Sequence, residues 1–284
     1  MLYKQIDSIP KKIIKEKLKT FFNEDDIKND ITTNTFINKK KTIKINFIAE
    51  FDGVFCGTQI IENAFSKKVK ASIFIKDGFK VKEGFKIASI EGPSFEILRK
   101  ERVVLNLIQR MSGIASETNR YTAKAFRKNI KILDTRKTTP GLRIFEKYAV
   151  HCGGGANHRF NLSKGIMIKD NHIESNNNIK ETLKKISLNP VPTQVEIDTV
   201  QQLKECLNYK VDAVLLDNME PQKIKECIKI IKKSNQKVFV EVSGGITFKT
   251  LSKYLIPGID AISVGAIIHQ ATFKNIKLEP EEQL

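Results

Sequence analysis

The sequence predicts an α+β region followed by an incomplete parallel α/β barrel of about six strands, and three observations lead to this. Between residues 42 and 92, runs of alternating apolar and polar residues are separated by glycines, as in a small, largely antiparallel sheet. From Lys131, short apolar runs alternate with amphipathic helical patterns, which is typical of βαβ units in a parallel sheet. About six such units fit into roughly 140 residues, whereas a closed eight-stranded barrel usually takes about 250.

The first region begins with one or two short helices and an acidic turn in residues 1 to about 35. Its expected strands are TIKINFIAE, ASIFIK and FKIASIEG. After these, Ser94 can cap a helix with apolar residues at helical spacing. We expect Gly113 to interrupt this helix and a second one to continue to about Lys128.

The second region is expected to contain the strands KILDT, GIMIK, TQVEID, DAVLLD, KVFVEV and DAISVG. Helical patterns separate the later ones, namely TVQQLKECLN, PQKIKECIKIIKKS and TFKTLSKYL. A doubly wound open sheet is the alternative to an open barrel. The predicted domains are therefore residues 1–112 with the connecting helix, the barrel in 113–270, and a segment, 271–284, that returns to the first domain.

The net charge of +17 raises the question of nucleic-acid binding. The lysines are spread along the whole chain among Ile and Asn, and no nucleic-acid motif is present, so we expect no nucleic-acid partner. No apolar run approaches the roughly 18 residues that a membrane span needs. The polar N-terminus lacks a hydrophobic signal core, so the expected location is the cytoplasm.

The four cysteines form no C-x-x-C pair, and their spacing fits neither a zinc site nor a disulfide framework. Buried, reduced thiols are therefore the preferred interpretation. A zinc site from His151, His158 and His172 is conceivable, but these spacings do not stack the three ligands on one helical face.

Charged or glycine-rich residues follow nearly every predicted barrel strand. In parallel α/β proteins such positions line the ligand crevice. The positions are Arg136, Lys137, Lys169, Asp170, Glu196, Asp198, Asp217, Asn218, Glu241, Ser243 to Gly245, Ser263 and Gly265. Arginine is the fork-shaped partner of carboxylate or phosphate, and several cations in one crevice need an anion. The sequence therefore predicts a site for a polyanionic small molecule.

Two glycine turns, SGGI and SVGA, follow the last two strands and lead into helices. Their backbone N–H groups can bind a phosphate, which in barrels commonly sits at the last strands. Glu196 and Asp217, on neighbouring strands, can bind ribose hydroxyls or a divalent metal through water. They can equally pair with lysines and hold the site open.

Lys169 also suggests a different chemistry, because Schiff-base aldolases place a lysine at a barrel strand end. That chemistry needs a lysine whose pKa is depressed. Asp170, the next residue, would instead favour the charged ammonium if it points the same way. The density of arginines also favours anion binding over carbonyl trapping.

Several long blocks resemble one family. TRKTTPGLR, EKYAVHCGGGANHR and IKDNHI are similar to signature blocks of quinolinate phosphoribosyltransferase, also called nicotinate-nucleotide pyrophosphorylase (carboxylating). LRKERVVLNLIQRMSGIAS, DITT and FIAEFDGVFCG resemble its N-terminal blocks, so the similarity covers nearly the whole chain. The related molybdenum-transport-associated proteins diverge in the KYAV and NHR region.

The resemblance implies an N-terminal α/β sandwich domain, an open α/β barrel, and a homodimer with a shared active site. It implies transfer of phosphoribosyl from phosphoribosyl pyrophosphate to quinolinate with Mg²⁺, releasing CO₂ and pyrophosphate. The residues implied to hold the quinolinate carboxylates are Arg136, Lys137, His158, Arg159 and Lys169, with Arg102 from the neighbouring subunit.

The resemblance also implies that Glu196 and Asp217 face the ribose and the metal. Ser243, Gly244 and Gly265 are implied to hold the 5′-phosphate. We expect Lys137, Lys169, Glu196 and Asp217 to be the catalytic residues.

Overall fold

The computed structural model describes residues 2–176, 178–184, 191–234 and 236–281, which form two compact units. The barrel unit consists of residues 1–5, 120–138 and 155–270, and the sandwich unit of residues 6–119, 139–154 and 271–284. The last three residues of the predicted C-terminal segment, 282–284, lie outside the described residues.

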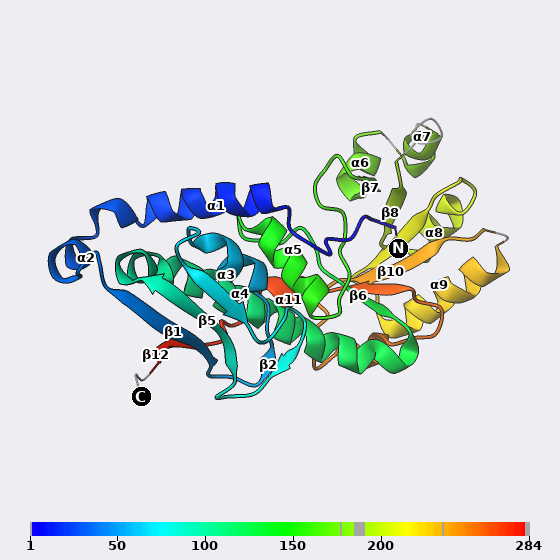
Figure 1. The fold of residues 1–284 in the computed structure, drawn as a ribbon. Helices are drawn as coiled ribbons and strands as arrows, with labels where there is room; N and C mark the ends of the chain where they lie inside the picture. The colour runs from blue at the N-terminus through cyan, green and yellow to red at the C-terminus, as the bar shows by residue number, and fades with distance from the viewer. Residues whose placement is uncertain (1, 177, 185–190, 235, 282–284) are drawn as a thin grey trace. The chain divides into compact units, whose positions relative to one another are not determined.

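The barrel unit is built on a six-stranded parallel sheet in the order β6-β11-β10-β9-β8-β7 (Figure 1). The strands are β6 (Lys131–Leu133), β7 (Ile166–Ile168), β8 (Thr193–Ile197), β9 (Ala213–Asp217), β10 (Phe239–Ser243) and β11 (Ala261–Ser263). Five of the six lie inside the runs that the sequence predicts, and β10 extends one residue beyond its predicted run, to Ser243. Among the described residues β6 and β7 pair on one side only, so the barrel is not closed and the predicted open α/β barrel is confirmed.

The central barrel strands β8 and β9 are buried on both faces, as their continuous apolar runs predict. All five residues of β8 and the first four of β9 are buried. The helices of the unit are α6 (Asp170–Glu174), α7 (Ile179–Lys184), α8 (Val200–Cys206), α9 (Pro221–Lys233), α10 (Leu251–Tyr254) and α11 (Ala266–His269), with the short turn η2 (Phe126–Lys128).

Helix α9 illustrates why these segments are helical. Pro221 is its first residue, where a missing N–H costs nothing. Its buried residues recur at positions i, i+3, i+4 and i+7, so one apolar stripe is buried while lysines cover the rest; they are Ile224, Cys227, Ile228 and Ile231.

The sandwich unit contains a four-stranded antiparallel sheet in the order β12-β1-β5-β3. Its strands are β1 (Thr42–Ala49), β3 (Lys70–Ile73), β5 (Lys86–Pro93) and β12 (Ile276–Pro280), and β2 (Gly53–Val54) pairs separately with β4 (Lys80–Val81). Its helical elements are α1 (Lys11–Glu24), η1 (Ile27–Asn29), α2 (Ile31–Phe36), α3 (Thr58–Ala64), α5 (Arg143–Cys152) and residues 94–119 of α4 (Ser94–Ala125). The predicted antiparallel sheet is confirmed.

The expected break at Gly113 is wrong, because α4 runs without interruption from Ser94 to Ala125. A Cβ atom at Gly113 would lie 2.1 Å from the carbonyl oxygen of Thr272. The glycine therefore lets the C-terminal segment approach the helix backbone, and it is a packing device rather than a helix end.

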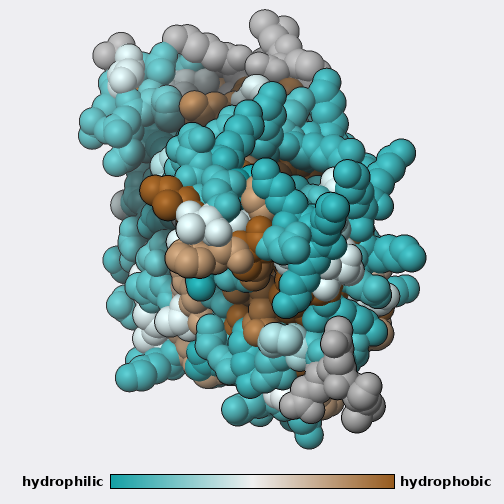
Figure 2. All heavy atoms as spheres, turned by 60° about the vertical axis from the view of Figure 1, so that its left-hand side comes forward, coloured by the Kyte–Doolittle hydropathy of each residue, from teal (hydrophilic) through white to brown (hydrophobic). Residues whose placement is uncertain are grey.

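Among the described residues, no helix is both long and apolar enough to cross a membrane. Figure 2 shows that hydrophilic side chains cover most of one face of the molecule, around a smaller apolar area.

Candidate functional site

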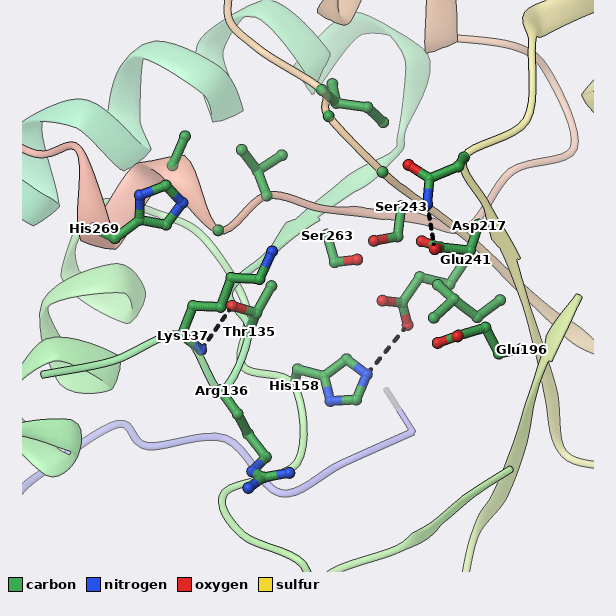
Figure 3. Close-up of a pocket in the computed structure, with 18 of the residues that line it drawn as sticks. Thr135, Arg136, Lys137, His158, Glu196, Asp217, Glu241, Ser243, Ser263 and His269 are labelled. Carbon is green, nitrogen blue, oxygen red and sulfur yellow. Dashed lines mark hydrogen bonds and ion pairs between the residues drawn. The ribbon is translucent and has the colours of Figure 1, made fainter. Parts of the chain in front are cut away.

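A cavity of about 600 Å³ lies in the barrel unit, at the carboxyl ends of its parallel strands. Ten of the eleven predicted site residues line it, although they come from segments more than 120 residues apart. Figure 3 shows part of this lining, including Arg136, His158 and Glu196. The ten residues are Arg136, Lys137, His158, Arg159, Lys169, Glu196, Asp217, Ser243, Gly244 and Gly265. The eleventh, Arg102, belongs to the sandwich unit, where it is exposed on α4.

One side of the cavity is the cationic wall, formed by Arg136, Lys137, Arg159 and Lys169. Arg136 and Lys137 follow β6 and are exposed. Arg159 is buried, and its Nη1 donates to the carbonyl oxygen of Gly165 at 2.9 Å. Burial lowers the pKa of Arg159, and the nearby charge of Arg136 lowers it further. Such a cluster is stabilised by a bound anion.

The other side is the acidic wall, formed by Glu196, Asp217 and Glu241 on three adjacent strands. Lys169 connects the two walls, because its Nζ lies 2.6 Å from Oε2 of Glu196. Burial nevertheless raises the pKa of Glu196, since it outweighs the effect of Lys169. The negative charge of Asp217 acts in the same direction as burial. The acidic wall therefore concentrates negative charge in a partly desolvated place.

Glu241 forms the floor of the cavity and is fully buried. Burial raises its pKa to about 7, although Gln194 donates a hydrogen bond to its Oε2 at 2.8 Å. The nearby hydroxyl of Ser263 also favours the charged form, but no hydrogen bond to Oε1 is formed among the described residues. A buried carboxyl oxygen without a partner is costly, so Oε1 is available to a ligand.

His158 lies between the two walls (Figure 3). Its Nδ1 accepts the backbone N–H of Arg159 at 2.7 Å, so Nδ1 carries no proton and the ring is neutral. We therefore assign the proton to Nε2, which lies 3.1 Å from Oε1 of Gln194 and 3.7 Å from Oε2 of Glu241. His158 can thus offer a hydrogen bond, but its charge does not add to the cationic wall.

Two buried residues outside the cavity lining, Asp134 and Tyr3, hold His158 in position. Asp134 accepts the backbone N–H of His158 at 2.8 Å and the side-chain amide of Asn157 at 2.7 Å. The hydroxyl of Tyr3 donates to Oε1 of Gln194 at 3.0 Å, and its ring lies 4.6 Å from that of His158. His158 is therefore held through both its backbone and its ring.

The two glycine turns close the remaining side of the cavity. Gly244 has φ +103°, and a Cβ atom there would lie 2.3 Å from Oδ1 of Asn218. A Cβ atom at Gly265 would lie 3.2 Å from Cδ of Lys137. Glycine at these positions keeps the backbone close to the cavity, as anion binding by N–H groups requires.

Glu196 and Asp217 fit a magnesium ion held through water. Oxygen ligands suit Mg²⁺, which keeps several of its waters. Oδ2 of Asp217 accepts the side-chain amide of Asn218 at 2.6 Å, and Glu196 already pairs with Lys169. Over the described residues, the one compact group of metal-binding side chains lies elsewhere, so neither a direct acidic cage nor the zinc site of three histidines is formed there.

Sequence reasoning missed the roles of Tyr3, Gln194 and Glu241. Glu241 and Ser263 lie at the ends of predicted strands, and this position indicates that they line the ligand crevice. It indicates no particular role for Glu241. Tyr3 is 191 residues from Gln194, and no pattern near the N-terminus indicates this contact.

At the carboxyl ends of the barrel strands, basic side chains face acidic side chains and two glycine turns. In an open parallel α/β barrel this arrangement defines an enzyme that acts on anionic, phosphorylated small molecules. Two family models match the chain. The quinolinate phosphoribosyl transferase N-terminal domain matches residues 30–112, and the C-terminal domain matches residues 114–279. The chain belongs to the quinolinate phosphoribosyltransferase family, which confirms the resemblance found in the sequence.

Related proteins agree over nearly the full length. A protein of Bacillus subtilis named probable nicotinate-nucleotide pyrophosphorylase [carboxylating] is 39% identical over 94% of this chain and 93% of its own. The nicotinate-nucleotide pyrophosphorylase structure from Francisella tularensis has a TM-score of 0.91 and 31% identity, covering 98% of this chain and 99% of that one. NadC from Streptococcus pyogenes gives a TM-score of 0.90 and 33% identity, covering 97% and 99%.

Proposed function

We infer that the chain transfers the phosphoribosyl group of phosphoribosyl pyrophosphate to quinolinate. One carboxylate leaves as CO₂, and the products are nicotinate mononucleotide and pyrophosphate, for NAD biosynthesis. The observation that carries this inference is the cavity where the cationic wall faces the acidic wall and two glycine turns, in a chain of this family. Purified protein supplied with quinolinate, phosphoribosyl pyrophosphate and Mg²⁺ should release CO₂ and nicotinate mononucleotide; no CO₂ release would overturn the proposal.

The cationic wall is proposed to hold the two carboxylates of quinolinate. Arg136 and Arg159 offer fork-shaped donors, and Lys137 and Lys169 are point charges. His158 is proposed to contribute one neutral hydrogen bond. Holding both carboxylates orients the pyridine nitrogen towards the ribose, and this orientation accounts for a large part of the rate enhancement expected for a two-substrate reaction.

The acidic wall and the glycine turns are proposed to hold the phosphoribosyl group. Ser243, Gly244 and Gly265 would bind the 5′-phosphate. As the bond to pyrophosphate breaks, positive charge develops on the ribose, and Glu196 and Asp217 would stabilise it electrostatically. Mg²⁺, held through water by the same two residues, would neutralise charge on the departing pyrophosphate.

Decarboxylation then needs no covalent enzyme intermediate. The ring nitrogen is positively charged once it carries the ribose, so the electron pair left by the departing CO₂ is stabilised on the adjacent ring carbon, which is then protonated. A Schiff-base mechanism would need a free, neutral amine at Lys169, whereas its Nζ is engaged with Glu196 at 2.6 Å. Borohydride with substrate present should leave activity intact; irreversible loss through Lys169 would favour the Schiff base.

The assembly is proposed to be a homodimer in the cytoplasm, in which Arg102 reaches the active site of the partner subunit. Exposed apolar side chains support a partner surface on the sandwich unit. Six of the eight large exposed apolar residues among those described belong to it: Ile31, Phe36, Phe74, Phe79, Phe85 and Phe273. Exposed apolar residues that gather into a contiguous patch commonly mark protein–protein contacts.

Complementation tests the shared site. Arg102→Ala and Lys169→Ala are each expected to be nearly inactive, but heterodimers would contain one intact site. Random mixing should therefore restore about one quarter of the native activity, because half of the dimers are mixed and one of their two sites is complete. The two variants are mixed, unfolded and refolded together, and native protein treated in the same way is the control. If activity does not recover, Arg102 acts in the active site of its own chain or has no part in catalysis.

A further inference from the structure

Two cysteines and an aspartate meet in the sandwich unit. Cys56 follows β2, Asp77 lies in the turn between β3 and β4, and Cys152 is the last residue of α5. Their sulfur and carboxylate atoms all lie within 4.8 Å of one another. Cys56 is fully buried, and the other two residues are half-buried.

The backbone around both cysteines is fixed against helix α4. The hydroxyl of Ser112 binds the N–H of Cys56 at 3.1 Å and its carbonyl oxygen at 3.2 Å. A Cβ atom at Gly57 would lie 2.5 Å from the side chain of Ile108, and one at Gly153 would lie 2.4 Å from the carbonyl oxygen of Ala115. Each cysteine thus precedes a glycine packed directly on the same helix, so the backbone that carries the two thiols is held in place before any ligand binds.

The carboxylate of Asp77 is oriented in the same way. Its Oδ1 accepts the backbone N–H groups of Gly57 and Thr58 at 2.6 and 2.8 Å, and its Oδ2 accepts the hydroxyl of Tyr148 at 2.8 Å. The chain has 49 lysines and arginines, yet none of those described forms an ion pair with Asp77. Carboxylates that bind a metal ion are typically oriented by hydrogen bonds from neighbouring groups. Asp77 is oriented in this way and has no ion-pair partner among the described residues.

We propose that Cys56, Asp77 and Cys152 bind one thiophilic divalent cation, of which Zn²⁺ is the representative. Two thiolates and one carboxylate, with a water at the fourth position, form a donor set that Zn²⁺ accepts. Tetrahedral zinc with bonds of about 2.3 Å to sulfur places two sulfur atoms about 3.8 Å apart, so side-chain adjustments of about 1 Å suffice. On binding, two metal–sulfur bonds form and the two thiol protons pass to the solvent.

The ion would tie the end of α5 to the strand segment after β2 and to the β3–β4 turn, all within the sandwich unit. This role is structural and separate from the proposed transferase chemistry. A disulfide between the same two sulfur atoms is the competing outcome, and the mass measurement described below separates it from metal binding.

The test uses the full chain, stripped with a chelator and kept under a reductant that does not bind metal. Titration with Cd²⁺ should give a thiolate-to-metal ultraviolet band that saturates at one ion per chain, and Zn²⁺ should displace it. Cys152→Ser and the isosteric Asp77→Asn should each weaken binding at least about tenfold, and Tyr148→Phe should weaken it by up to about tenfold. Zn²⁺ should raise the Tm of the native chain but not that of Asp77→Asn.

Cys227→Ser is the matched control, because Cys227 is a buried free cysteine in the barrel unit and should keep full binding. No band in the native chain, an unchanged band in Cys152→Ser, or an equal loss in Cys227→Ser would overturn the proposal. A Cys56–Cys152 disulfide under the same reducing conditions, seen as the loss of two hydrogens by mass, would overturn it too. Cys56→Ser can fail to fold, so the half-buried Cys152 and Asp77 decide the test.

Discussion

The two walls of the cavity hold their charges in opposite ways. On the cationic wall, Arg136 and Lys137 are exposed, and the side chain of Lys169 is 44% exposed. On the acidic wall, the side chain of Glu196 is 10% exposed and Glu241 is buried. Three of the four cations, all but the buried Arg159, therefore stay hydrated until an anion arrives, whereas Glu196 and Glu241 have already lost most of their water and respond strongly to a positive charge that develops beside them.

The largest effect is expected on the cationic wall. Arg136→Ala should lower kcat/KM for quinolinate by a factor that corresponds to about 2–5 kcal/mol of free energy, because a bidentate contact with a carboxylate, desolvated in the complex, is lost. Affinity for phosphoribosyl pyrophosphate should change far less. Separate binding titrations with each substrate check this, and an equal loss for both would contradict the assignment of Arg136 to quinolinate.

The next effect concerns the buried floor of the acidic wall. The pKa of Glu241 is raised from 4.5 to about 7, so the folded protein keeps a proton that the unfolded chain releases between these values. Native stability therefore falls as pH rises through this window, and Glu241→Gln, which cannot ionise, should escape that fall. The difference in the free energy of unfolding, variant minus native, should grow by up to about 3 kcal/mol from pH 4.5 to above 7.

Urea unfolding at a series of pH values measures this difference. If the difference stays flat across that range, the folded protein does not hold the proton on Glu241.

A smaller effect separates two adjacent glycines beside the acidic wall. Gly244→Ala combines a positive φ with a clash against Asn218 and should cost about 1–3 kcal/mol of stability. Gly245→Ala, at φ +55° with open space around the new methyl group, should cost about 1–2 kcal/mol at most. Thermal unfolding and the KM for phosphoribosyl pyrophosphate should rank the two variants in this order, and the reverse order would argue against the close packing of Gly244.

The smallest effect is expected behind His158. Tyr3→Phe removes the hydrogen bond to Gln194 and leaves the ring in place, so we expect a loss of about 0.5–1.5 kcal/mol in stability. The KM for quinolinate should rise only slightly. Native KM and stability in this variant would show that Gln194 needs no support from the N-terminus.

Sequence reasoning reached the strands and most of the site because both depend on local patterns. Each of the six barrel strands can be predicted from the apolar composition of its own segment. The charged residues that follow them meet because parallel strands end at the same edge of the sheet. The helix through Gly113 and the contact of Tyr3 with Gln194 depend on segments 159 and 191 residues away, so no local pattern contains them. Glu241 was visible, but its role follows from complete burial, which requires the assembled floor.

The barrel unit is assembled from three separate stretches of chain, and the first is only five residues long. The ribosome releases Tyr3 and Gln5 long before Asn157 and Gln194, their hydrogen-bonding partners, have been made. Completion of the His158 environment is thus a late folding event, because it needs contacts between segments far apart in the chain. A fragment cut to residues 120–270 would lack Tyr3 and Gln5 and their hydrogen bonds to Gln194 and Asn157.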